Sequence, residues 1–129
     1  MSETKYGKYF LNEIDPQQRQ RAFGRLPQTI AYTDDDIIKG SQLFWALWIR
    51  SLPMREHGPH THNDPEVLVM LGTDPENPRD LGCEIELCMG PEMESHIITE
   101  STLVYVPGNF LHCPIRYRNL RRPFIFIQA

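Results

Sequence analysis

The stretch of this sequence best suited to chemistry is residues 58–66, which read GPHTHNDPE. His60 and His62 are two residues apart, and on an extended chain this spacing directs both imidazoles to one face. Glu66 has the same parity and lies just beyond a proline-containing kink. Two neutral imidazoles and a carboxylate suit Fe, Mn, Ni, Co or Zn. The segment therefore predicts one divalent transition metal ion as the cofactor of each chain.

A fourth ligand would have to come from elsewhere in the chain, and His112 is a candidate. It comes after the turn-forming residues 107–109 (PGN), on a later predicted strand. Asp64 is close enough to compete with Glu66 for the carboxylate position. Parity with His62 and the spacing favour Glu66.

The elements that must position these residues read as short strands after residue 27. Runs of apolar and β-branched residues alternate with turn-forming stretches such as residues 73–82 (TDPENPRDLG). Eleven prolines and eight glycines accompany these runs, and the combination indicates an all-β sandwich or barrel. The predicted strands cover residues 29–32, 43–49, 66–71, 83–89, 96–99, 102–106, 110–115 and 123–127.

The beginning of the chain differs from the rest. Residues 1–27 are polar and irregular, and Asp15 and Pro16 could cap and begin one short helix. The remainder of the chain contains no internal repeat or linker. We therefore predict an N-terminal extension over residues 1–27 and one barrel domain over residues 28–129.

The spacing His60-x-His62-x-x-x-Glu66, with Pro107-x-x-x-x-His112 about fifty residues later, resembles the two motifs of the cupin superfamily. Residues 74–86 (DPENPRDLGCEIE) also resemble a loop of small uncharacterised bacterial cupins. The resemblance covers residues 43–127. It implies a small antiparallel cupin β-barrel, which is a jelly-roll-like double-stranded β-helix. It also implies that two His and one Glu from the first motif and one His from the second bind a metal inside it.

The chain departs from the cupin motifs at turn-shaping positions. Met54 stands where a glycine is expected before the first His, and Asn109 stands where a glycine is expected after the motif proline. Arg116 replaces an asparagine after the last His, and Gly72 falls one residue early. Asn tolerates a left-handed turn, so these departures affect loop detail more than metal binding.

The function that the resemblance implies is metal-centred chemistry on a small molecule. Four protein ligands on an octahedral metal would leave two positions open for substrate, water or dioxygen. A dioxygenase-type reaction is the first expectation. A non-redox isomerase or lyase reaction and a non-catalytic metal- or metabolite-binding module are the alternatives, because one fold hosts many functions. The resemblance also implies a homodimer.

Several further residues are candidates for the pocket, although none is assigned a catalytic role from the sequence. Arg116 shares the parity of His112 and could clamp a substrate carboxylate. Glu84, Glu86 and Tyr105 are candidate general acids or bases. Asp34 to Asp36 read as a surface loop.

Composition excludes some classes of partner. Thirteen Lys and Arg against seventeen Asp and Glu give a net charge of −4, unlike a basic nucleic-acid surface. No apolar run approaches the roughly 20 residues of a membrane span. The polar first residues do not resemble a signal peptide, so we expect a cytoplasmic location. Cys83, Cys88 and Cys113 form no Cys-x-x-Cys pair, and we expect three reduced thiols.

Overall fold

The computed structural model describes residues 4–12, 27–51 and 58–129. The short helix predicted at Asp15 and the departure at Met54 fall outside these residues. The described elements are a 3-10 turn, η1 (Gly7–Tyr9), and the strands β1 (Pro27–Thr33), β2 (Phe44–Ile49), β3 (Glu66–Leu71), β4 (Asp80–Met89), β5 (Glu94–Glu100), β6 (Thr102–Val106), β7 (His112–Arg118) and β8 (Phe124–Gln128).

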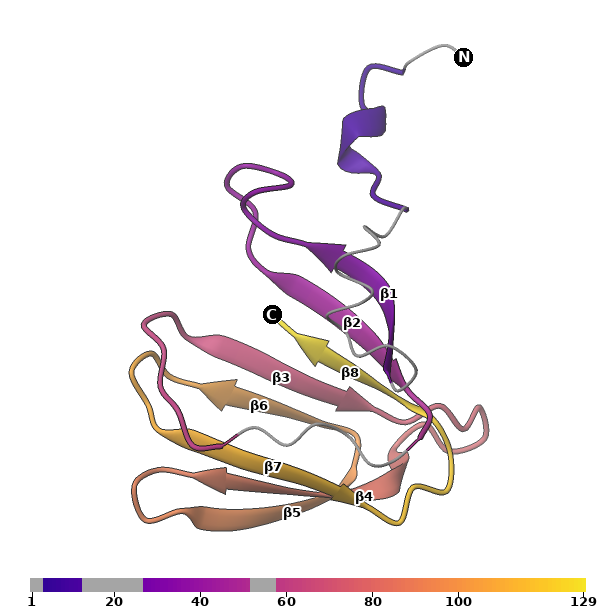
Figure 1. The fold of residues 1–129 in the computed structure, drawn as a ribbon. Helices are drawn as coiled ribbons and strands as arrows, with labels where there is room; N and C mark the ends of the chain where they lie inside the picture. Colours follow the sequence, from indigo (N-terminus) through magenta and orange to yellow (C-terminus); the bar gives the residue numbers. More distant parts are fainter. Residues whose placement is uncertain (1–3, 13–26, 52–57) are drawn as a thin grey trace.

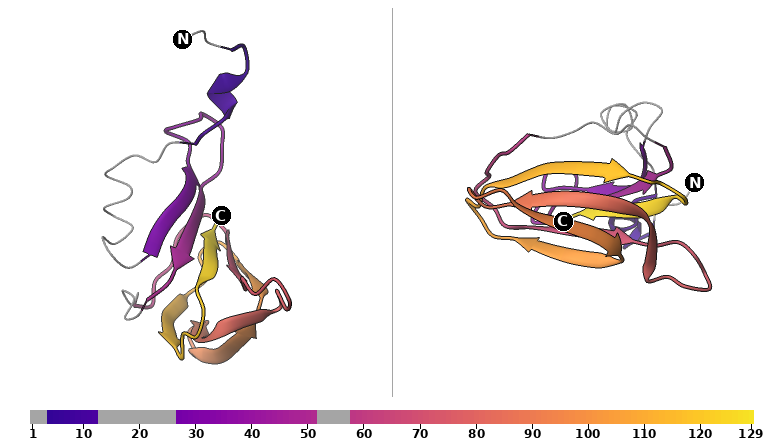
Figure 2. Two further views of the ribbon diagram at one scale, coloured as in Figure 1. Left: turned by 90° about the vertical axis from the view of Figure 1, so that its right-hand side faces the viewer. Right: turned by 90° about the horizontal axis from the view of Figure 1, so that it is seen from below.

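The strands form two antiparallel sheets, ordered β1-β2-β8-β3-β6 and β5-β4-β7. The larger sheet folds over the smaller one, while β1 and β2 extend beyond it (Figure 1). An end-on view shows the two layers enclosing a barrel-like interior (Figure 2). The predicted all-β antiparallel fold is therefore confirmed. No helix among the described residues is long and apolar enough to cross a membrane.

The core lies between the two sheets and reflects the alternation of strand side chains. On β2, Leu47 and Ile49 point inward, and Ile49 pairs across the ladder with the buried Phe124 of β8. On β4, Ile85 and Leu87 point inward from the smaller sheet. The charged residues of opposite parity on β4, Glu84 and Glu86, are only partly buried, as the outward face of a two-layer β fold requires.

One close backbone approach fixes the long loop between β3 and β4. A Cβ on Gly72 would lie 2.2 Å from the carbonyl oxygen of Asp80, so a side chain cannot be accommodated there. The Asp80 carboxylate accepts a hydrogen bond from Arg122 Nη2 at 2.8 Å, and this contact ties the loop to the segment before β8. The hydrogen bond from Arg122 is the main cause that lowers the pKa of Asp80.

Candidate metal centre

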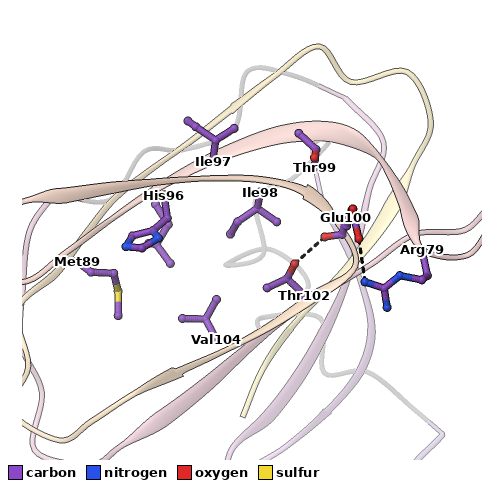
Figure 3. A pocket seen from close by; sticks show the side chains of 10 residues that line it. Arg79, Met89, His96, Ile97, Ile98, Thr99, Glu100, Thr102 and Val104 are labelled. Carbon is purple, nitrogen blue, oxygen red and sulfur yellow. Dashed lines mark hydrogen bonds and ion pairs between the residues drawn. The ribbon is translucent and has the colours of Figure 1, made fainter.

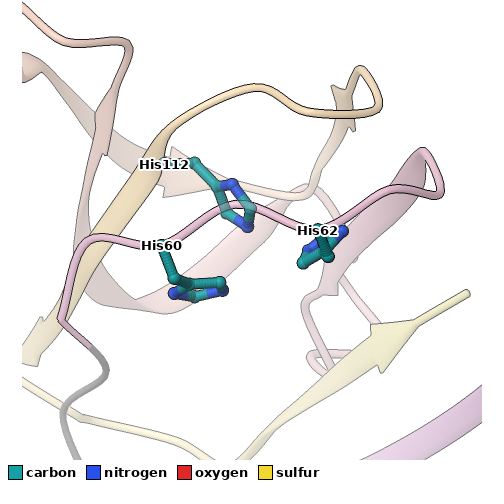
Figure 4. Close-up of side chains that lie close together, drawn as sticks. All are labelled: His60, His62 and His112. Atoms are coloured by element: carbon teal, nitrogen blue, oxygen red, sulfur yellow. The ribbon is translucent and has the colours of Figure 1, made fainter.

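Three histidines converge at one end of the barrel (Figure 4). His60 and His62 come from the segment before β3, and His112 is the first residue of β7. One ligand nitrogen from each ring can be chosen so that all three lie within 4.8 Å of one another. The sequence placed these residues together from spacing and resemblance, and the structure brings them into one group.

Backbone pairing holds two of these residues side by side. His60 N donates to His112 O at 3.0 Å, and His112 N donates to His60 O at 3.1 Å. A further bond, from Asn109 N to His62 O at 2.7 Å, ties the turn before β7 to the same segment. The segment that carries His60 and His62 thus pairs with the start of β7, at the edge of the smaller sheet.

Each imidazole is oriented through its Nδ1 atom. Nδ1 of His60 and Nδ1 of His112 each lie 2.8 Å from the backbone carbonyl oxygen two residues earlier. Nδ1 of His62 lies 2.9 Å from the carbonyl oxygen two residues later. A carbonyl oxygen can only accept, so each neutral ring carries its proton on Nδ1 and keeps a lone pair on Nε2. This is the tautomer that a metal-binding histidine needs.

The Nε2 atom of His112 is the strongest indication of a metal site in this group. Its side chain is 1% exposed, and its buried Nε2 has no hydrogen-bond partner among the described residues. Glu66 Oε1 lies 3.1 Å away, but an unprotonated nitrogen has no hydrogen to donate to a carboxylate. Two lone pairs therefore face each other in a buried place, which is costly unless a cation or a proton joins them. The donor set fits a metal ion.

Glu66 faces the histidine group from the start of β3. Its Oε1 is 3.3 Å from His62 Nε2 as well as 3.1 Å from His112 Nε2. Its side chain is half-buried, whereas Asp64 is exposed and contacts His62 through its carbonyl oxygen. Glu66 is thus the carboxylate that contacts the Nε2 atoms of His62 and His112.

Arg116 does not share the face of His112, and the expectation from strict alternation was wrong. Between β4 and β7, Leu87 pairs with Ile115 while Met89 pairs with His112, so β7 carries one extra residue at this point. Such a bulge reverses the parity of the later residues in the strand. Arg116 is exposed and pairs with Glu86, at 3.5 Å between Nη1 and Oε1.

The three candidate acids and bases lie in two different places. Glu84 pairs with Arg118, and Glu86 accepts a hydrogen bond from Ser95 Oγ at 2.6 Å. These carboxylates lie on the outward face of the smaller sheet, whose inward positions are taken by Ile85 and Leu87. Tyr105 lies on β6 and lines a cleft that includes two of the predicted metal ligands.

This cleft has a volume of about 930 Å³ and lies beside the histidine group. His62 and Glu66 form part of one wall. The loop between β1 and β2 forms another part, through Asp34, Asp35 and the residues around Leu43. Sequence reasoning read this acidic loop as plain surface. The length of the connection between β1 and β2 is the sequence feature that could have indicated that this loop reaches the cleft.

A second hollow, of about 460 Å³, lies between β5 and β6 and contains none of the three clustered histidines (Figure 3). Ile98 and Val104 line its middle. At one end Arg79 Nη2 donates to Glu100 Oε2 at 2.8 Å, and this ion pair is largely exposed. His96 lines the hollow and pairs with an acid on its own strand.

The chain is similar to several solved structures. A cupin-2 domain protein from Shewanella frigidimarina is 14% identical, with a TM-score of 0.45 and coverage of 92% of this chain and 94% of that one. KdgF from Halomonas is 15% identical, with a TM-score of 0.45 over 79% and 74%. A protein of unknown function from Acinetobacter is 18% identical, with a TM-score of 0.48 over 83% of each chain.

The sequence comparisons give no further relationship. No protein-family model matches the chain, and no curated protein matches it. The cupin resemblance therefore rests on the motif residues named above, and the structural likenesses concern the fold.

Proposed function

We propose that the protein is a metal-dependent cupin that acts on a small molecule, with His60, His62, Glu66 and His112 as the metal ligands. The observation that carries this proposal is the buried Nε2 of His112, which faces a carboxylate oxygen and has no hydrogen-bond partner within the described part of the chain. A bound metal would supply Lewis acidity or, if redox-active, dioxygen chemistry. The chain itself supplies oriented imidazoles, a carboxylate and an adjoining cleft.

The residues around the group support a site that a small molecule can reach. The cleft of about 930 Å³ falls in the usual range for ligand pockets, roughly 300–1,000 Å³. His62 and Glu66 lie in its wall, so a molecule in the cleft would contact the ligand shell from one side. A closed structural site would instead surround its metal with protein groups.

A dioxygenase-type reaction is the first candidate and a non-redox isomerase or lyase reaction the second. Nitric oxide separates an open iron site from a closed one before any substrate is known. We expect anaerobic protein loaded with Fe(II) to bind nitric oxide and give the electron paramagnetic resonance signal of a high-spin iron–nitrosyl. A spectrum that nitric oxide leaves unchanged would contradict the oxygenase proposal and would favour the non-catalytic metal- or metabolite-binding module.

We also propose a homodimer. The outward face of the larger sheet carries apolar side chains, among them Leu71 and Leu103, which are 37% and 64% exposed. Exposed apolar surface of this kind marks interfaces when it is contiguous. Light scattering should give twice the mass of one chain, and Leu103→Asp should shift the protein toward the monomer. A wild-type mass of one chain would overturn this proposal.

A further inference from the structure

The strands of the larger sheet carry almost no charge. Glu66 is the only charged residue within the described strands β1, β2, β3, β6 and β8, and it points inward, toward His62 and His112. Residues directly opposite each other in a ladder share a face. One row of such residues crosses all five strands: Ala31, Ala46, Ile127, Val69 and Leu103. The buried Phe126 and Met70 have the opposite parity, so this row lies on the outward face, which is free of charge.

The smaller sheet differs from the larger one on its outward face. There Glu84 pairs with Arg118, and Glu86 pairs with Arg116. Charged side chains of both signs are typical of a surface that stays in water and resists association. The larger sheet instead exposes Leu103 and Tyr105 on β6 beside partly buried apolar residues of β3 and β8. A contiguous apolar face of this kind indicates a contact surface.

A second copy of the chain suits this charge-free face. Each copy has a net charge of −4, so two copies repel where their acidic surfaces approach each other. A twofold contact places the same patch of both copies against each other. A patch without charges brings no like charges together and keeps the acidic surfaces apart. Two negatively charged copies can therefore meet on this face without the repulsion that a charged patch would cause.

The charge-free face borders the cleft beside the histidine group. Val67 on β3 pairs with Tyr105 on β6, and both residues line this cleft. Tyr105 is exposed and lies two residues from Leu103, on the same face of the strand. Val67 directly follows Glu66, which also lines the cleft. A chain that packs on Leu103 and Tyr105 therefore reaches the rim of the cleft.

We infer that a second copy of this chain packs on the charge-free face and that the contact extends over Tyr105 to the cleft. By symmetry, each copy then covers one side of the cleft of the other copy, and the two sites are completed by the dimer. The inference gives the proposed homodimer its face and a role in the site. It rests on the proposed function only in treating the cleft as the place where a small molecule reaches the metal.

Paramagnetic broadening between copies tests this arrangement. A nitroxide is attached to the Gln42→Cys variant, at an exposed residue of the cleft, and this chain is mixed with isotope-labelled wild type. The three native thiols are buried and should remain unlabelled. We expect the amide signals of Leu103 and Tyr105 in the isotope-labelled copy to broaden. Unchanged signals at both residues would overturn the inference.

A label on the opposite side of the molecule is the matched control. Arg116 is exposed on the outward face of the smaller sheet. A nitroxide on Arg116→Cys should leave the signals of the isotope-labelled copy unchanged. Broadening from this label, with none from Gln42→Cys, would show that the copies meet through the smaller sheet and would overturn the inference.

Two variants with the same change of net charge test the face independently. Tyr105→Lys places like charges in the contact and should raise the dimer dissociation constant at least about tenfold, as measured by analytical ultracentrifugation. Ile97→Lys makes the same kind of change at an exposed apolar residue of β5, in the smaller sheet, and should leave the constant unchanged. Equal weakening in both variants would show a general charge effect and overturn the assignment of the face.

Metal analysis of the same samples separates this inference from the proposed function. A chain that shows the broadening from Gln42→Cys but takes up no metal would remove the proposed function and leave the shared cleft standing. A chain that takes up one metal ion but is a monomer, or dimerises through the smaller sheet, would remove the inference and leave the metal site standing.

Discussion

His60 and His112 exchange a reciprocal pair of backbone hydrogen bonds, 3.0 and 3.1 Å between nitrogen and oxygen. This bridge joins the segment before β3 to the first residue of β7. Their ring centroids are consequently 4.4 Å apart. Because the backbone pairing places these two rings, a metal bound between them would require little further ordering of the chain.

The carboxylate ligand can be identified by a pair of isosteric changes. Glu66→Gln should weaken metal affinity by at least about tenfold, because Glu66 Oε1 contacts the Nε2 atoms of both His62 and His112. Asp64→Asn should have little effect, since Asp64 holds His62 through its backbone carbonyl. Competition with a chromophoric chelator measures both affinities. A loss of metal affinity in Asp64→Asn, with no loss in Glu66→Gln, would show that Asp64 is the carboxylate ligand in place of Glu66.

The pairing of Asp80 with Arg122 predicts a pH-dependent contribution to stability. The pKa of Asp80 is lowered in the folded protein, so the contribution is present above the ordinary value of 3.8 and is lost as pH falls through the folded pKa. Asp80→Asn should therefore lower the urea midpoint at pH 7, and the difference from wild type should shrink near pH 3. An equal difference at both pH values would show that the charge is not responsible.

The cysteines should behave as three protected thiols. Cys83, Cys88 and Cys113 are free and buried, as expected from the sequence. Burial raises the pKa of Cys113 to about 11, so little thiolate exists at neutral pH. A thiol reagent should react slowly with the native protein and should find three equivalents in denaturant. A single equivalent would reveal a disulfide and count against the proposed cytoplasmic location.

Much of the fold was predictable because strands and turns leave strong local signals. The predicted strands at residues 66–71 and 102–106 coincide with β3 and β6. β4 is longer than predicted, beginning at Asp80 rather than Cys83, because the end of the polar loop continues into the strand. His60 and His62 were predicted to lie together because residues two apart on an extended chain point to the same face.

The parts that sequence reasoning missed depend on contacts between distant segments. A bulge in β7 opposite Leu87 and Met89 reverses the parity of the strand. Pro114 indicated that the ladder could break between His112 and Arg116, but not that one extra residue would be inserted, so Arg116 was expected on the wrong face. The part of the cleft formed by Asp34 and Asp35 was missed for a similar reason. Asp35 reaches the site only because the β1–β2 connection folds toward residues 62–66, which lie far along the chain.

Metal content per chain tests the central claim most directly. Protein purified without chelator or nickel resin should contain about one transition metal ion per chain by elemental analysis. The His60→Ala, His112→Ala double variant should contain almost none. His96→Ala serves as the control, since His96 is exposed and pairs with Glu94, and it should keep the wild-type content. Full metal content in the double variant would contradict the account.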